Sequence, residues 1–416
     1  MRKPVQASLR ARMRPLHVAV ALQGFMLWPP IEKLFLSEIG FDAAAVGIMA
    51  AAYAAFVPLV EVCSGLLADR WSRRGVLVVS SAALALTCLI GGLSTNVATY
   101  LLSALALGVY FAMYSGTMEA IVYDTVLEET GGSGSFEQRI GRIRLAESAT
   151  LVASSLLGGW LASLTGTRLT YFLTIPFALL SIVAYLRFDE PTLHQTSGRV
   201  PLRAQLVTTG RALSGGGRLL PIVALSVLTA VTMQSLFEFG PLWLVALAVP
   251  AFVFGPYWAG LMSTLGLGGL LAGRFGADRR GTRAAAAIVM LVAALTLATG
   301  AGAAAAIAAQ IALTLLLMVA SIHVARVLHD SVPSNVRAGV ASGVGAMTWL
   351  TFLPVALAIG FVSSRFGIQS AGLLITAGTV AAGLLWVTAT GGRPAEAAGD
   401  PSTEAPREYE PATSAA

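Results

Sequence analysis

This 416-residue sequence has little charge, only two lysines and only two cysteines. Charged residues make up 12% of the chain, whereas a soluble domain carries about 25%. Hydrophobic residues make up 56%, and so few charges cannot cover that much apolar surface in water. The composition therefore excludes an ordinary soluble protein and favours one that faces lipid.

The sequence also lacks the motifs of several chemical classes. It contains no GxxxxGK(S/T) phosphate loop, no nucleophile elbow, no metal-ligand cluster and no dinucleotide fingerprint before a helix. Cys63 and Cys88 lie in separate apolar runs, without the spacing of metal ligands. We therefore expect neither an enzyme nor an ATP-driven pump, and we expect no cofactor and no metal.

Twelve apolar runs of spanning length follow one another along the chain. A bilayer core about 30 Å thick requires about 20 apolar residues in a helix. We predict an all-α membrane protein with a polar linker at 189–218 between two sets of six helices, which lie in domains 16–188 and 219–390. Residues 1–15 form the predicted N-terminal segment, and residues 391–416, rich in Pro, Ala, Glu, Ser and Thr, form a predicted disordered tail. The runs cover 16–37, 44–67, 75–94, 99–127, 145–165 and 169–188, then 219–248, 252–274, 284–300, 303–328, 339–363 and 369–390.

The positions of the cations predict the orientation. With the N-terminus inside, only Lys33, Arg168 and Arg365 of the 27 Lys and Arg residues fall outside the inner segments. We therefore expect both termini in the cytoplasm, and the scarcity of lysine suggests a bacterial inner membrane. The net charge of +6 then reflects topology and lipid headgroups, so no nucleic acid partner is expected.

A repeated segment supports the division into two halves. The segment GLLADRWSRRG (65–75) follows the second apolar run, and GLLAGRFGADRRG (269–281) follows the eighth. Two parallel halves related by an axis along the membrane normal would produce such a repeat.

The first segment resembles the signature of the major facilitator superfamily, G-x-L-a-D-r-x-g-r-r, although Ser72 stands where the family often has glycine. The resemblance implies two pseudo-symmetric six-helix bundles, and we expect a monomer that moves a small molecule. It also implies that the signature latches the halves together, with Asp69 near the N-terminus of the span 339–363. Asp124 would pair with Arg70 or Arg73. The alternative is that these arginines only enforce topology. The implied gating residues are Gly65, Asp69, Arg70, Arg73, Arg74 and Asp124.

Charged residues inside the spans mark a candidate path. Inserting one into the membrane costs roughly 2.5–3.5 kcal/mol of free energy, so such residues are expected where they have a function. Glu238 is the strongest candidate. It stands beside Gly240-Pro241, which interrupts a span, and close to Gln234 and Trp243. We predict that these side chains contribute to a site for a proton or for a hydrophobic or cationic substrate.

Three further acids are weaker candidates for the path. Glu119 shares a helix face with Tyr123, and a buried structural ion pair is its alternative role. Glu61 fits a structural ion pair as well as a proton site. Glu32 could line the outer mouth of the path. Adjacent residues of a helix point about 100° apart, so Glu32 and Lys33 need not pair with each other. We expect the Lys33 side chain to extend toward the membrane interface.

Two basic side chains in the span 303–328 receive structural interpretations. We expect Arg326 to extend to the interface and His323 to satisfy a backbone group. The altered spacing around Asp278 makes a second latch doubtful.

The leading hypothesis is proton-coupled export of amphipathic small molecules, with the proton gradient as the energy source. The glycine-rich signature of antiporters is reduced to Gly158-Gly159 in the fifth run. A proton symporter that imports a neutral nutrient such as a sugar is the alternative. A membrane scaffold or receptor that transports nothing ranks third, because it would not need acids such as Glu119 and Glu238.

Overall fold

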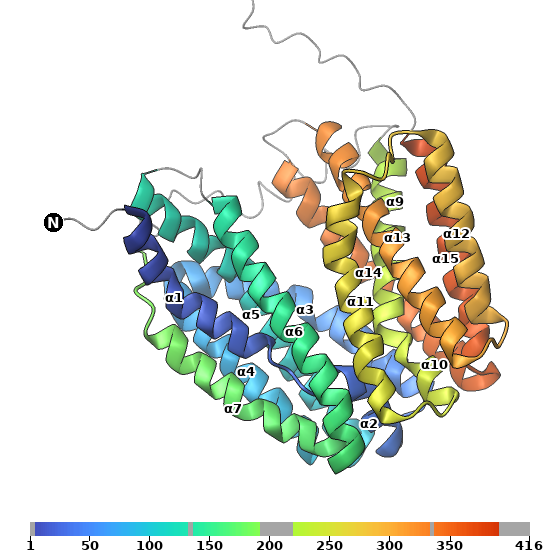
Figure 1. Ribbon diagram of the computed structural model, residues 1–416, viewed down its shortest axis with the longest axis horizontal. Helices are drawn as coiled ribbons and strands as arrows, with labels where there is room; N and C mark the ends of the chain where they lie inside the picture. Colours follow the sequence, from blue (N-terminus) through green and yellow to red (C-terminus); the bar gives the residue numbers. More distant parts are fainter. Residues whose placement is uncertain (1–4, 132–135, 192–218, 333–336, 391–416) are drawn as a thin grey trace, which may run out of the picture.

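The structure is a computed structural model that describes residues 5–131, 136–191, 219–332 and 337–390 (Figure 1). The predicted linker from residue 192 and the predicted tail from residue 391 lie outside the described residues. The N-terminal half contains α1 (Val5–Gly24), the 3₁₀ turn η1 (Pro29–Ile31), α2 (Glu32–Glu38), α3 (Ala43–Arg70), α4 (Arg73–Leu93), α5 (Val97–Thr130), α6 (Phe136–Thr165) and α7 (Thr167–Leu186). The C-terminal half contains α9 (Leu219–Phe239), α10 (Pro241–Ala246), α11 (Ala251–Ala272), α12 (Arg280–Ala298), α13 (Ala303–Asp330), α14 (Arg337–Phe366) and α15 (Ile368–Ala389).

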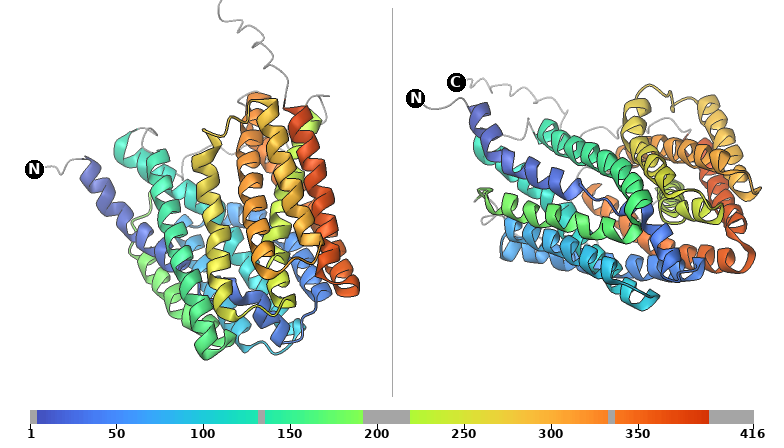
Figure 2. Two further views of the ribbon diagram at one scale, coloured as in Figure 1. Left: turned by 45° about the vertical axis from the view of Figure 1, so that its right-hand side comes forward. Right: turned by 60° about the horizontal axis from the view of Figure 1, so that its bottom comes forward.

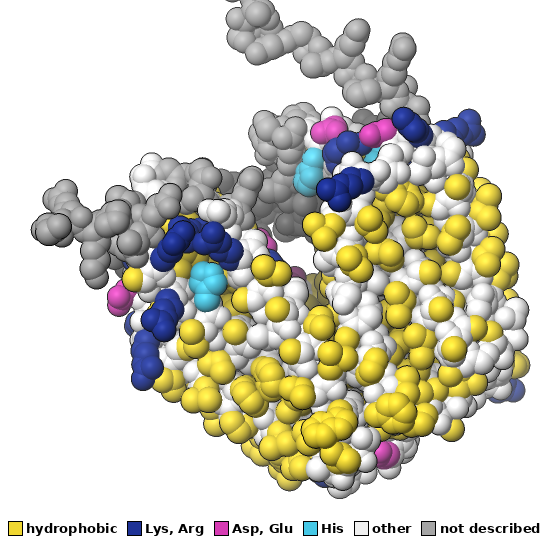
Figure 3. All heavy atoms as spheres, in the orientation of Figure 1, with side chains coloured by type: hydrophobic (Ala, Val, Ile, Leu, Met, Phe, Trp, Pro, Cys, Tyr) yellow, Lys and Arg dark blue, Asp and Glu magenta, His cyan; other side chains and the backbone are white. Residues whose placement is uncertain are grey.

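The two halves are six-helix bundles that diverge like the arms of a V (Figures 1 and 2). They meet at one end, here called the far end, where α2 and α10 lie. They stand apart at the other end, where α1 begins and α15 ends. Most Lys and Arg side chains in view lie at this second end, here called the basic end, and the surface between the halves is hollowed there (Figure 3).

Within the described residues, ten segments are long and apolar enough to cross a membrane, and α9 and α10 together form one of them. The remaining two spans are α11 and α1, whose continuation across the bilayer is the η1–α2 segment. The described helices thus confirm the predicted all-α fold of twelve spans in two bundles. Helix starts follow local sequence, because the side chains of Asp42, Ser72 and Asn96 accept hydrogen bonds from the first turns of α3, α4 and α5.

The largest differences from the predicted runs are at the starts of α1 and α6, which begin nine or more residues early. α1 starts at Val5 because Leu9 and Met13 are buried in a core at the basic end of the N-terminal half. α6 starts at Phe136, nine residues before the predicted run, and therefore carries Arg139 and Arg144 on a helix rather than in a loop. Apolar content alone misses such amphipathic first turns.

Glycines allow the halves to meet at the far end. A Cβ on Gly47 of α3 would lie 2.7 Å from the carbonyl oxygen of Ala356 in α14 and 2.9 Å from the Cα of Gly360. A Cβ on Gly159 of α6 would lie 2.5 Å from the backbone nitrogen of Gly255 in α11. Any side chain at these crossings would push the helices apart, so the closed far end depends on backbone contact between the halves.

Candidate substrate and proton path

The first span of each half is broken near the far end. α1 ends at Gly24, and the chain resumes at Pro29 in η1. α9 ends at Phe239, and α10 starts at Pro241, so the predicted interruption of this span is confirmed. Each break ends the regular backbone hydrogen bonding of a helix within the membrane-spanning region.

Three charged side chains meet between the halves at these breaks. Lys33 Nζ lies 2.8 Å from Glu32 Oε2 and 2.5 Å from Glu238 Oε1. The side chain of Lys33 is 3% exposed, and those of Glu32 and Glu238 are 17% and 20% exposed. Two carboxylates share one ammonium group, so the ionised cluster carries one excess negative charge.

Tyrosines hold Glu32 within the N-terminal half. The Tyr100 hydroxyl of α5 donates a hydrogen bond of 2.8 Å to Glu32 Oε1, and it lies 2.8 Å from the Tyr171 hydroxyl of α7. Both tyrosines are buried, and the ring of Phe35 packs against both. Glu32 is therefore fixed by its own half, whereas the bond from Lys33 to Glu238 crosses between the halves.

The prediction that Lys33 extends to the interface is wrong. Lys33 is buried at the start of α2, where its ammonium group pairs with the adjacent Glu32 as well as with Glu238 of the opposite half. The sequence contained a signal for this. Lys33 falls among the predicted outer segments, where cations are scarce, so an acidic partner explains a lysine there better than the orientation in the membrane does.

Lys33 and Glu238 occupy nearly equivalent positions in the two halves. They are 205 residues apart, while the repeated segments begin at Gly65 and Gly269, 204 residues apart (269 minus 65). The contact thus joins corresponding parts of the two first spans, with opposite charges on the two sides.

The break between α9 and α10 is filled by polar side chains. Gln310 Nε2 donates to the Gly240 carbonyl over 3.3 Å, and the Tyr257 hydroxyl donates to Gln310 Oε1 over 2.6 Å. Trp243 is 2% exposed, and its indole N–H donates over 3.0 Å to the Leu297 carbonyl. The predicted place of Trp243 on the path is therefore wrong, because its ring lies in the core of the C-terminal half.

Aromatic side chains lie close to this cluster. Tyr53 of α3 and Trp349 of α14 pack across the halves with ring centroids 5.9 Å apart. Tyr53 lies within electrostatic range of Glu32, Glu61 and Glu238. Glu61 is exposed on α3, eight residues after Tyr53, and its role on the path remains a prediction.

Phe237 and Trp258 form a second aromatic pair in the C-terminal half, in T-shaped contact at 6.2 Å. Gln234 is half-buried one turn before Glu238 in α9. Tyr123 is exposed and packs against Phe136 of α6 with ring centroids 5.4 Å apart. The roles predicted for Gln234 and Tyr123 stay predictions.

Glu119 has a partner that the sequence did not indicate. Arg144 of α6 lies 2.9 Å from Glu119 Oε1 and 3.4 Å from Glu147 Oε2. The side chains of Arg144 and Glu119 are 46% and 56% exposed, so this is an ion pair but not the buried one considered as an alternative. Arg144 was missed because the first turns of α6 were assigned to a loop.

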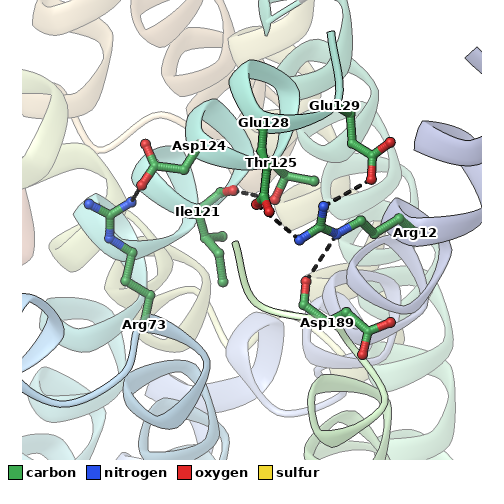
Figure 4. Close-up of polar contacts among 8 residues, drawn as sticks. All are labelled: Arg12, Arg73, Ile121, Asp124, Thr125, Glu128, Glu129 and Asp189. Carbon is green, nitrogen blue, oxygen red and sulfur yellow. Dashed lines mark hydrogen bonds and ion pairs between the residues drawn. The ribbon is translucent and has the colours of Figure 1, made fainter. Parts of the chain in front are cut away.

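Part of the signature segment lies outside the described side chains, namely those of Gly65, Asp69 and Arg70. Asp124 of α5 forms an ion pair with Arg73, one of the two arginines that the resemblance implied as its partner (Figure 4). Both side chains are largely buried.

Arg12 of α1 forms a second charged contact at this end. It pairs with Glu128 at 3.2 Å and Glu129 at 2.9 Å, and it also donates to the main-chain oxygen of Asp189 (Figure 4). The start of α1 is thereby tied to the ends of α5 and α7.

Glu190, just after α7, contacts the signature segment in a way the sequence did not indicate. Its carboxylate accepts hydrogen bonds from the Ser72 hydroxyl at 2.5 Å and from the backbone N–H groups of Arg73 at 2.6 Å and Arg74 at 3.3 Å. The Arg74 guanidinium also donates to the carbonyl of Phe188 over 3.1 Å. A carboxylate at this position satisfies the free N–H groups of the first turn of α4 and interacts favourably with its dipole. The beginning of the predicted linker is therefore anchored to the segment assigned to gating.

The C-terminal half has an ion pair that resembles Arg73–Asp124, with the acidic and basic residues exchanged. Arg326 of α13 pairs with Asp278, and the hydrogen bond that it donates lowers the pKa of Asp278. His323 Nε2 lies 3.6 Å from Asp278, and its other ring nitrogen accepts from the Trp386 indole over 3.1 Å. Arg326 extends to the exposed end of its half, where Asp278 is its partner. The expectation for His323 is corrected, because its ring contacts the side chains of Trp386 and Asp278 and not a backbone group.

Comparisons with known proteins agree with this geometry. Residues 15–349 match the profile of the Major Facilitator Superfamily. Multidrug resistance protein 1 of Bacillus subtilis (strain 168) is 25% identical over 173 residues, which cover 41% of this chain and 43% of that protein. The chain thus matches less than half the length of this relative.

Two solved structures share the fold at low sequence identity. The nucleoside transporter NupG has a TM-score of 0.72 at 14% identity, over 90% of this chain and 98% of that one. A bacterial homologue of the human lysosomal transporter Spinster, in an inward-facing and occupied conformation, has a TM-score of 0.72 at 14% identity, over 94% and 97%.

Proposed function

This chain belongs to the Major Facilitator Superfamily and is a transporter, not an enzyme, and we propose that it exports amphipathic small molecules in exchange for protons. In this proposal a monomer alternates between two conformations, each open to one side of a bacterial inner membrane. The proton gradient supplies the energy, and no cofactor takes part. The protein holds its substrate between the two halves, close to Glu238.

The distribution of charge supports an orientation with both termini in the cytoplasm. Arg12, Arg73, Arg279 and Arg280 belong to the basic end, whereas the far end has few cations. The positive-inside rule assigns the basic end to the cytoplasm. The hollow then opens inward and the far end is closed to the outside, as expected for a state that receives an intracellular substrate.

The excess carboxylate in the cluster of Glu32, Lys33 and Glu238 is the observation that carries the proposal. An uncompensated charge at this depth is unfavourable, so a proton or a cationic substrate that neutralises it would be favoured. A group that accepts either a proton or a cation, but not both, provides the competition that exchange requires. Nearby rings such as Tyr53 and Trp349 supply apolar and cation–π contacts for an amphipathic cation.

The multidrug resistance protein that shares 25% identity with part of this chain supports export. The structural neighbours, at 14% identity, indicate the fold alone and do not favour one substrate. Import of a neutral nutrient with protons remains the competing function, and transport assays distinguish the two.

The experiment uses purified protein in liposomes with an imposed pH gradient and two substrate panels, lipophilic cations and neutral sugars or nucleosides. We expect the gradient to drive cations toward the acidic side and Glu238→Gln to abolish this gradient-driven movement. Glu38→Gln is the matched control, because Glu38 accepts a hydrogen bond from Thr167 within its own half. Transport of sugars together with protons, or transport of cations that ignores both pH and Glu238→Gln, would refute the proposal.

A further inference from the structure

Lys33 has two carboxylate partners that belong to different moving bodies. Glu32 is on the same segment and is held by Tyr100, whereas Glu238 belongs to the opposite half. Among the described residues, the other charged side chain with a hydrogen bond across the far end is Asp42, whose carboxylate accepts from Ser364 over 2.6 Å. The bond from Lys33 to Glu238 is thus the buried ionic contact between the halves at the closed end.

We propose that Lys33 is the residue that locks the far end, and that it exchanges partners when the lock opens. In the closed state Lys33 bridges Glu32 and Glu238. When a proton binds the Glu238 carboxylate, or a cationic substrate neutralises it, Lys33 remains on Glu32 and its bond across the halves is lost. This inference rests on the proposed proton-coupled function and adds the residue that links neutralisation of Glu238 to opening.

Glu32 makes the exchange possible because Lys33 keeps a counter-charge in both states. An ammonium group left alone in a buried site would be strongly destabilising, and opening would then be prohibited. The hydrogen bond from Tyr100 holds the Glu32 carboxylate in position, so Glu32 does not follow the C-terminal half when it moves. Opening therefore exposes a neutral Glu238 and an ion pair that stays intact within the N-terminal half.

The groups around Glu238 leave a single cation for this role. Acidic and phenolic groups near the cluster are Glu32, Tyr53, Tyr100 and Tyr171, together with Tyr257, whose hydroxyl donates its hydrogen bond to Gln310. Glu61 lies eight residues beyond Tyr53 in α3. Arg168 is directed elsewhere, since its guanidinium lies over the Phe35 ring and donates to the Gly92 carbonyl. Among the described side chains, Lys33 is thus the cation that bonds Glu238.

Asp42 does not provide the pH response. The hydrogen bonds that it accepts from Ser364 and from the backbone N–H of Ala45 lower the pKa of Asp42 below its ordinary value. A lowered pKa keeps the carboxylate ionised from pH 5 to pH 8, and its contact with Ser364 weakens only as the pH falls through that lowered value. Opening of the far end between pH 5 and pH 8 must therefore arise elsewhere.

The test measures opening separately from transport. Ala356, in α14, is fully buried at the crossing with Gly47, so a cysteine there is reached from outside only when the far end opens. We would prepare Ala356→Cys in a Cys63→Ser, Cys88→Ala background. The rate of reaction with a membrane-impermeant maleimide would then be measured on intact cells between pH 5 and pH 8.

Removal of either partner across the halves should open the far end at pH 7. We expect Glu238→Gln and Lys33→Gln each to speed labelling about tenfold, which corresponds to about 1.4 kcal/mol. The double variant should label no faster than the faster single variant, because all three lack the same bond. Glu38→Gln, an equivalent change at the far end, should label like the parent, because the hydrogen bond that Glu38 accepts from Thr167 stays within its own half.

Glu32→Gln separates an exchange of partners from a simple ion pair. In the parent, labelling should accelerate as the external pH falls, because Glu238 becomes neutral. Glu32→Gln should remain slow at pH 7 and should require a pH about one unit lower for the same acceleration, because Lys33 would lose its second counter-charge. A simple ion pair without exchange predicts no such shift.

The outcomes separate this inference from the proposed function. Fast labelling of Glu238→Gln and Lys33→Gln without gradient-driven transport in the parent would retain the lock and reject proton-coupled export. Labelling within twofold of the parent in both variants would reject the lock, whatever the transport assays show. Equal pH profiles for Glu32→Gln and the parent would reject the exchange of partners. A protein that elutes as a single symmetric species in detergent excludes misfolding as the source of fast labelling.

Discussion

The far end and the basic end use charge in different ways. At the far end, Lys33 and Asp42 bond side chains of the opposite half, and glycine crossings bring the backbones together. At the basic end, among the described side chains, the pairs Arg73–Asp124 and Asp278–Arg326 stay within one half. Charge at the basic end therefore stabilises each bundle, whereas charge at the far end sets how the bundles sit relative to each other. Substitutions at the two ends should accordingly affect different measurements.

The largest effect is expected from a side chain placed in a far-end crossing. Gly159→Leu would put a Cβ 2.5 Å from the backbone of Gly255, and overpacking of this kind costs about 1–3 kcal/mol. Because the clash exists only while the far end is closed, we expect transport to fall about tenfold or more, with faster external labelling of the Ala356→Cys reporter. Gly266→Leu is the control, since a Cβ there meets nothing within 4 Å. Normal transport by Gly159→Leu would mean that closure does not need this crossing.

At the basic end, a substitution that removes a charged contact should lower the stability of the protein. Asp124→Asn removes the charge that pairs with Arg73 in a largely buried position. Hydrogen bonds to charged groups contribute about 1.5–3 kcal/mol, so the apparent melting temperature in detergent should fall by several degrees. External labelling of the reporter at the far end should not accelerate. If labelling accelerates while the melting temperature stays constant, the contrast between the two ends is wrong.

A smaller loss of stability is expected from a substitution of Glu190, which contacts the first turn of α4. Its carboxylate accepts from two backbone N–H groups and from Ser72, and caps of this type contribute about 0.5–2 kcal/mol. Glu190→Gln should lower the melting temperature by less than Asp124→Asn does. Asp189→Asn is a matched control, because Arg12 bonds the main-chain oxygen of Asp189. Equal effects of the two substitutions would argue against a specific cap.

The smallest effect concerns Asp278 and its pH dependence. The hydrogen bond from Arg326 lowers the pKa of Asp278, so its stabilising contribution is present above the ordinary value of about 4 and is lost as the pH falls through the lowered value. The pair is exposed, and such pairs contribute less than about 1 kcal/mol. The difference in melting temperature between the parent and Asp278→Asn should be constant from pH 5 to pH 8 and shrink below pH 4. A difference that varies between pH 5 and pH 8 would assign the titration to another group, such as His323.

Much of the fold could be predicted because each membrane span is determined by one continuous stretch of the sequence. Each apolar run must reach across hydrocarbon by itself, and the repeat at 65–75 and 269–281 indicates the two halves directly. The predicted break at Gly240-Pro241 was correct for the same reason, since proline acts on its own helix. The errors at α1 and α6 lie at amphipathic helix starts, whose burial depends on neighbouring helices.

The candidate site was predicted less completely. Glu32 and Glu238 could be selected because carboxylates in apolar runs are conspicuous, but Lys33 and Arg144 were assigned to an interface and a loop. Trp243 was placed on the path because it stands five residues after Glu238, and the break after α9 instead turns its ring into the core. Glu190 gave no signal, since its role requires the end of α7 to lie beside the start of α4.

The amino-acid sequence by itself determined the number of spans, the division into halves, the family and the bias of cations toward one end. These properties depend on composition and spacing along the chain. Only the tertiary structure decided which charges meet, such as Lys33 with Glu238 at a separation of 205 residues, and at which end the halves close. The physical reason is that an ion pair in an apolar medium depends on distances of a few ångströms, and packing between helices sets those distances.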